Sequence, residues 1–264
     1  MDKETPAGAF TAVMVLAFIC SLLVAGAAVG LRPRQEINRK LDQKKNILRA
    51  AGLYQGKGDV ETLFQQVEAK IVRLADGDFV PPETLDPAEF DQLQSALDDE
   101  TGRKLSREED KAGLKRQENF SLVYLVKKAG HLDKVILPIR GKGLWSTLYG
   151  YVALSADLST ISGITFYEHG ETPGLGGEID NPDWQAGWQG KQLYDPKSPN
   201  GPNGQPAIQI VKGQGQGPYQ VDGVSGATLT MNGVNNLMYF WFGEHGFGPF
   251  LERYKGAIKK KTDR

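Results

Sequence analysis

The sequence predicts an α+β fold, in which an N-terminal transmembrane helix precedes a domain with a mainly antiparallel sheet flanked by helices. Three observations predict it. An uncharged run fills residues 7–31, segments rich in β-branched and aromatic residues dominate residues 120–211, and an amphipathic segment follows at 229–243. Strands and helices that are grouped along the chain, and not strictly alternating, are typical of α+β domains.

The N-terminal run has the length of a membrane anchor. From Ala7 to Leu31 there are 25 residues without a charged side chain. A helix rises about 1.5 Å per residue, so this run spans a hydrocarbon core of about 30 Å with some tilt. A cleaved signal peptide is the alternative, because Ala25-Gly26-Ala27 offers a cleavage-like spacing of small residues. The length of the run and a head without a basic region favour a retained anchor, with residues 1–6 as a cytoplasmic N-terminus.

The charges around the anchor leave its orientation open. Six basic residues lie between Arg32 and Lys45, whereas only Lys3 precedes the run. The positive-inside rule alone places the bulk of the chain in the cytoplasm, but long domains translocate largely regardless of such charges.

Residues 32–115 are expected to form a helical linker and accessory segment. A helix over 36–52 ends at Gly52, which suits a C-terminal cap. A second amphipathic helix is predicted over 60–74, with Asp59 as its N-cap. Pro81-Pro82 then breaks the chain, and the acidic stretch 83–110 is expected to form a short helix and loop.

The main domain is expected over 116–255, followed by a basic tail at 256–264. Long Gly- and Pro-containing loops over 168–184 and 196–206 are of the kind that is usually functional or mobile. The predicted strands cover 121–127, 134–139, 144–154, 161–167 and 207–211, and the predicted helix covers 229–243.

Composition excludes several classes of function. Lys+Arg 31 against Asp+Glu 32 gives a formal net charge of -1, which does not support nucleic-acid binding. A single cysteine, Cys20, excludes a disulfide framework and a Cys-ligated iron–sulfur cluster within the chain. His131, His169 and His245 are too scattered to predict a metal site.

The most informative motif lies at the entry to the last predicted helix, Asp222-Gly-Val-Ser-Gly-Ala-Thr228. A helix N-terminus directs free N–H groups and a positive dipole end at this turn, which favours a phosphate. The alternative is purely structural: Ser225 or Thr228 caps the helix.

This motif resembles the acceptor sequence to which a flavin transferase attaches FMN through a phosphoester. Further segments resemble the C-subunit family of the Na+-translocating NADH:quinone oxidoreductase, in the same order from Ala7 to Leu251. They are LDQKKNILRAAGL, GLWSTLYGYVAL, FYEHGETPGLGGEI, VDGVSGATLT and GPFL.

The resemblance implies a site for covalent FMN. Thr228 would carry the flavin as a phosphothreonyl ester and would not act as a catalytic residue. The remaining residues of the recognition turn would be Asp222, Ser225, Gly226 and Ala227.

A second wall is implied by the loop His169–Gly176, for which a plain surface loop is the alternative. Glu171 and Thr172 would bond the polar edge of the flavin, Gly174 would let the backbone approach the ring, and Leu175 would cover it. Trp145 would cover a ring face, unless it packs in the core.

The resemblance further implies a membrane-anchored electron carrier in NADH-to-quinone electron transfer coupled to sodium export. It implies a bacterial inner-membrane protein with a single span and a periplasmic domain. Its partners would be the other subunits of a six-subunit complex, membrane lipid, and a flavin transferase during maturation. Two alternatives stay open: the G subunit of an Rnf-type ferredoxin:NAD complex, and a non-redox anchored binding module.

Overall fold

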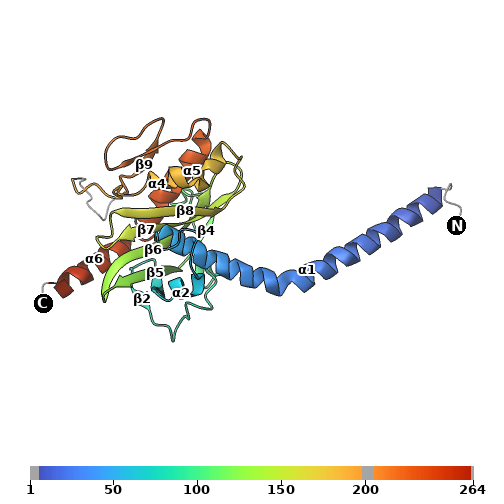
Figure 1. The fold of residues 1–264 in the computed structure, drawn as a ribbon, viewed down its shortest axis with the longest axis horizontal. Helices are drawn as coiled ribbons and strands as arrows, with labels where there is room; N and C mark the ends of the chain where they lie inside the picture. Colours follow the sequence, from blue (N-terminus) through green and yellow to red (C-terminus); the bar gives the residue numbers. More distant parts are fainter. Residues whose placement is uncertain (1–5, 198–204, 263–264) are drawn as a thin grey trace. The chain divides into compact units, whose positions relative to one another are not determined.

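The computed structural model describes residues 6–197 and 205–262, and the chain divides into two units, Met1–Lys44 and Lys45–Arg264 (Figure 1). Most of the loop expected over 196–206, and nearly all of the cytoplasmic N-terminus expected over 1–6, therefore lie outside the described residues.

The predicted membrane span is confirmed as an apolar helix. Helix α1 (Pro6–Ala50) contains a window with a mean hydropathy of 2.7 that is not buried by the protein. The helix expected over 36–52 is confirmed up to Ala50, but it is continuous with the anchor, because α1 continues through Pro33 and Arg32 pairs with Glu36 one turn on at 3.2 Å. The predicted stop at Gly52 is confirmed: its φ is +70° and its N–H donates to Arg49 O.

The helix expected over 60–74 is wrong beyond its first turn. Asp59 caps α2 (Val60–Phe64) as predicted, since its carboxylate accepts from Thr62 N at 2.8 Å. The chain then enters strand β1 (Val67–Arg73), which pairs along its whole length with a later strand. Strand pairing therefore overrides a helical spacing of apolar residues.

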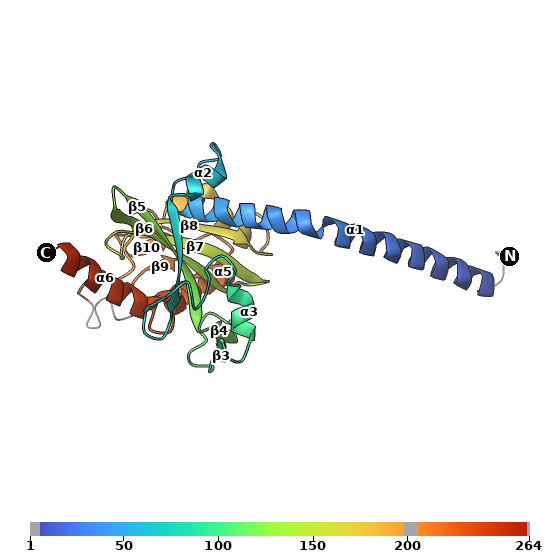
Figure 2. The same cartoon turned by 90° about the horizontal axis from the view of Figure 1, so that it is seen from below.

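The main sheet is antiparallel, as predicted, and contains six strands, but the strand expected over 207–211 lies outside it. Its order is β2-β1-β5-β6-β7-β8, and Figure 2 shows helix α5 on one side of it. Three of the predicted strands appear with shifted ends, and the strand expected from 144 starts at 147 because 143–146 form a turn. The further sheet strands are β2 (Phe79–Val80), β5 (Phe120–Lys128), β6 (His131–Lys142), β7 (Thr147–Ser155) and β8 (Ile161–Glu168).

The acidic stretch holds more structure than expected. Besides the predicted short helix, α3 (Gln92–Leu97), it contains strand β3 (Gly102–Lys104), which pairs with β4 (Arg116–Glu118). Both strands are short and contain charged residues, so their pattern gives no strand signal.

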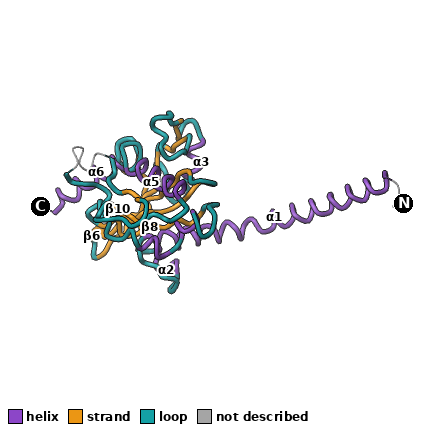
Figure 3. Tube along the Cα trace, turned by 90° about the horizontal axis from the view of Figure 1, so that it is seen from above, coloured by secondary structure: helices purple, strands orange, loops and turns teal. Residues whose placement is uncertain are grey.

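Loops and short elements connect the sheet to the last helices, as the loop colouring in Figure 3 shows. Strands β9 and β10 run parallel, and α6 takes up most of the residues expected as a basic tail. These elements are η1 (Gly176–Asp180), α4 (Pro182–Ala186), β9 (Gln209–Val211), β10 (Gln220–Asp222), α5 (Thr228–Phe242) and α6 (Gly248–Thr262).

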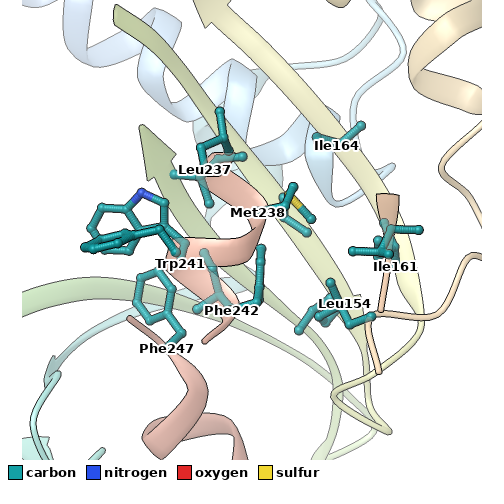
Figure 4. Packing of buried hydrophobic residues seen from close by; sticks show 14 of the residues in the cluster. Leu154, Ile161, Ile164, Leu237, Met238, Trp241, Phe242 and Phe247 are labelled. Atoms are coloured by element: carbon teal, nitrogen blue, oxygen red, sulfur yellow. The ribbon is translucent and has the colours of Figure 1, made fainter. Parts of the chain in front are cut away.

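Helix α5 packs into the main core. Met238 lies on the side of Leu154 of β7 and Ile164 of β8 (Figure 4), whereas Trp241 packs on β6, where its Nε1 donates to Arg140 O. The alternation of side chains along the strands directs the other set of residues to the opposite face. There Gly163 approaches the backbone of Ala50 so closely that a Cβ would collide with it. Helix α5, which begins with Thr228, is thus held by a rigid scaffold.

Candidate functional site

A cavity of about 240 Å³ lies where three segments meet: the β6–β7 turn, the loop after β8 and the start of α5. It brings together seven of the ten residues that the sequence predicts for the site, and leaves Asp222, Ser225 and Gly174 out of its lining. The lining residues are Leu144, Trp145, Glu171, Thr172, Leu175, Gly176, Gly226, Ala227, Thr228, Leu229 and Thr230.

Thr228 is the first residue of α5 and is exposed. Ala227 is the N-cap, and no side chain bonds to the cap. Among the described residues, neither the Ser225 hydroxyl nor the Thr228 hydroxyl has an intrachain hydrogen bond, so the helix-cap alternative is wrong. The N–H groups of the first helical turn have no intrahelical acceptor and are available to an anion.

Gly226 joins this turn to the opposite wall. Its φ is +78°, a left-handed conformation that favours glycine, and a Cβ there would lie 2.9 Å from Leu175 Cδ2. Gly174 also has a positive φ, +75°, and bends the loop next to Leu175.

Asp222 holds the base of the acceptor turn. Its Oδ1 accepts from Gly215 N at 2.8 Å, and its backbone carbonyl accepts from Trp184 Nε1 at 2.9 Å. Sequence reasoning missed Trp184, which gives no local signal because it lies 38 residues earlier in the chain.

Glu171 is buried, with 5% of its surface exposed, and its carboxylate is occupied by the protein itself. It accepts from the backbone N–H groups of Leu144 at 3.2 Å, Trp145 at 2.9 Å and Ser146 at 3.2 Å, and from Thr230 Oγ1 at 2.5 Å. Two bonds to each oxygen use about all of the acceptor sites of a carboxylate. Glu171 thus links the β6–β7 turn to α5, and the bond to a flavin edge that the resemblance implies stays a prediction.

The electrostatics of Glu171 follow from these bonds. Burial raises the pKa of the carboxyl, but the bonds from Thr230 and from the three backbone N–H groups outweigh it, and the net pKa lies below its usual value. Sequence reasoning missed Thr230, although a second hydroxyl two positions after Thr228 was visible in the motif.

Four large apolar side chains line the same cavity as Thr228 and stay exposed. The exposed fractions are 40% for Leu144, 69% for Trp145, 43% for Leu175 and 59% for Leu229. The alternative role of Trp145, packing in the core, is therefore wrong. Clustered exposed apolar side chains mark binding surfaces, and those beside this cavity suit a flat apolar ring.

The chain resembles known proteins along almost its whole length. Residues 143–242 match the FMN-binding domain family. The C subunit of the Na(+)-translocating NADH-quinone reductase of Yersinia pestis is 48% identical, with 94% of this chain and 92% of that protein covered. The same protein of Pseudomonas aeruginosa is 46% identical, with 95% and 96% covered.

The chain belongs to the C-subunit family of the Na+-translocating NADH-quinone reductase. Solved structures agree with this assignment. The NqrC of Shewanella oneidensis superposes with a TM-score of 0.75 at 37% identity, covering 83% of this chain and 99% of that chain. The C subunit of the reductase from Parabacteroides distasonis gives 0.64 at 28% identity, covering 84% and 96%. These matches favour the quinone reductase family over the Rnf-type alternative.

The residues of the cavity fit the FMN of this C-subunit family. An exposed hydroxyl and the free N–H groups of α5 suit the phosphate, and the four exposed apolar side chains suit the ring. The third alternative, a non-redox binding module, rested on the helix-cap role that the geometry of Ser225 and Thr228 does not support.

The loop of the second wall is also ordered by His169. Its Nδ1 lies 3.3 Å from Glu171 N, and its Nε2 lies 3.3 Å from Asp180 Oδ2. The backbone carbonyl of Thr172 accepts from Leu175 N and Gly177 N, which closes the turn that carries Leu175. The histidine to which the sequence assigned no role therefore orients the loop that carries Leu175 into the cavity wall.

Proposed function

We propose that this protein carries electrons through FMN that is bound covalently to Thr228 Oγ1 by a phosphoester. In this role the chain relays electrons within NADH-to-quinone transfer coupled to sodium export. When bound, FMN supplies the capacity to take up electrons and pass them on; the chain supplies the tether and the surroundings of the ring.

The state of the Thr228 hydroxyl supports this proposal most directly. It is exposed, it has no intrachain hydrogen bond among the described residues, and it stands at a helix N-terminus beside an apolar-lined cavity. A phosphodiester at this position keeps one negative charge, which a helix N-terminus stabilises by about 0.3–1 kcal/mol. Attachment through the phosphate leaves the ring unsubstituted, so the cavity walls are free to set its environment.

The apolar helix and the family support a membrane-anchored location. We place α1 in the bacterial inner membrane as a single span, with the FMN-binding domain in the periplasm. The partners are the other subunits of a six-subunit complex, membrane lipid, and a flavin transferase that attaches the FMN. The FMN-binding domain, expected from the sequence over 116–255, would also include β1 and β2, since these strands belong to the same sheet.

The attachment is tested by the intact mass of the chain after acid precipitation. The unmodified chain is expected to gain the mass of one FMN minus one water. Thr228→Ala is expected to lose this gain completely, because no Oγ remains, and Thr228→Ser to keep part of it. Thr84→Ala is the matched control, since Thr84 is an exposed threonine that does not line the cavity, and it is expected to keep the adduct. A Thr228→Ala chain that still carries covalent FMN contradicts the proposal.

A further inference from the structure

The side chain of Glu171 lines the cavity, and hydrogen bonds from the protein itself occupy both oxygens of its carboxylate. Its four hydrogen bonds come from two different parts of the chain: three backbone N–H groups of the β6–β7 turn and the hydroxyl of Thr230, which is 1% exposed. The bond to Thr230 joins two residues that lie 59 positions apart in the sequence. The carboxylate therefore fixes the segment that carries Leu144 and Trp145 relative to the helical turn that carries Thr228.

Two glycines leave the space that this carboxylate fills. A Cβ on Gly143 would lie 2.7 Å from Glu171 Oε1, and a Cβ on Gly176 would lie 2.9 Å from Glu171 Oε2 and collide with Thr230 Oγ1. Larger residues at either position would displace the carboxylate from the cavity wall. Because Gly143 and Gly176 pack closely on the two sides of the carboxylate, its oxygens are held in a single position.

We propose that Glu171 is the positioning residue of this cavity and that its negative charge lowers the reduction potential of the bound flavin. This inference rests on the proposed attachment of FMN at Thr228. A buried carboxylate that accepts four hydrogen bonds stays ionised near neutral pH. Reduction adds negative charge to the ring, and a fixed negative charge in the same cavity wall opposes it more strongly than in water, because the local dielectric is lower.

The decisive experiment is a redox titration of the full-length chain, with covalent occupancy checked by mass in each variant. Glu171→Gln removes the charge and one acceptor oxygen. It is expected to keep the covalent flavin and to raise the equilibrium constant for two-electron reduction about tenfold, which corresponds to a potential about 30 mV higher. Glu178→Gln is the matched control. It removes a charge seven residues along the same loop, where Glu178 bonds Asn181 Nδ2 at 2.7 Å and does not line the cavity, and it is expected to leave the potential unchanged.

A second pair of variants separates positioning from charge. Thr230→Val deletes one of the four bonds and keeps the carboxylate charge. It is expected to change the visible circular dichroism of the flavin with a smaller shift of potential than Glu171→Gln, and Thr230→Ser is expected to restore the parental spectrum.

The outcomes are distinguishable. Full occupancy with an unchanged potential in Glu171→Gln overturns the inference, and so does an equal shift in Glu178→Gln. If Glu171→Gln does not fold, a Thr230→Val chain with full occupancy and the parental spectrum overturns it. Absence of covalent flavin from the unmodified chain refutes the proposed function itself.

Discussion

Replacing Gly226 by alanine tests how far the acceptor turn depends on its left-handed residue. With φ at +78°, an L-residue costs roughly 1–2 kcal/mol. The added Cβ would also meet Leu175 Cδ2 at 2.9 Å, but this atom ends a side chain that is 43% exposed and free to rotate away. The backbone cost therefore dominates, and we expect unfolding to become easier by about 1–2 kcal/mol. For a folded unit of the size of Lys45–Arg264, this lowers the midpoint of thermal unfolding by about 2–8 °C.

The assay is thermal unfolding of the full chain in detergent, followed by tryptophan fluorescence, in a Thr228→Ala background so that bound flavin adds no stability. Gly190→Ala is the matched control, because Gly190 has a φ of +77° and a Cβ there would have nothing within 4 Å. The losses of unfolding free energy in Gly226→Ala and in Gly190→Ala are expected to agree within about 0.5 kcal/mol. A loss in Gly226→Ala that exceeds the control by more than about 1 kcal/mol, and that Leu175→Ala recovers, refutes the reasoning, since the steric contact would then dominate.

Three further predictions concern orientation and buried charge. A reporter that is active only in the periplasm is expected to work when fused after Arg264; activity of a cytoplasm-only reporter there would show that the basic residues of 32–45 set the orientation. The pKa of Glu171 is lowered on folding, so its stabilisation is present above its ordinary pKa of about 4.3 and is lost as pH falls through the folded value. The difference in unfolding free energy between the parent and Glu171→Gln is therefore expected to shrink below about pH 4, and a constant difference in urea titrations would contradict this. Glu118→Gln leaves Arg140 buried without its carboxylate partner, which is expected to cost about 3–5 kcal/mol in urea unfolding, and a loss under about 1 kcal/mol would show that the pair contributes little.

The local sequence pattern was sufficient to predict strands β5 to β8, but not strands β1 and β2 at the edge of the sheet. Strands β5 to β8 follow one another with short turns, so alternation and turn residues predict them. Strand β1 was misassigned because Leu63, Val67 and Ile71 are spaced four residues apart, as on a helix. What decides its structure is pairing with a distant strand, for example Ile71 with Leu122, and this information is not local.

The candidate site also contains residues that the sequence predicts and contacts that it does not predict. The acceptor motif and the loop after β8 predicted that Thr228, Leu175 and Trp145 belong together, and the cavity confirms that they line one space. The partners of Glu171 could not be predicted, because they are backbone groups and a hydroxyl that only the complete fold brings near. Sequence patterns identify residue types, whereas saturation of a carboxylate depends on the geometry of several segments.

The packing of α5 on β6 has a consequence for the order in which the chain matures. Hairpin contacts among β5 to β8 are local and are expected to form early, whereas Trp241 Nε1 donates to Arg140 O across 101 residues of chain. Helix α5 also follows β6, β7 and β8 along the chain, so it is synthesised after them. A chain whose hairpins have formed before α5 docks on the sheet would present Thr228 without the cavity around it. We therefore expect the acceptor threonine to meet its cavity only in a late step of folding.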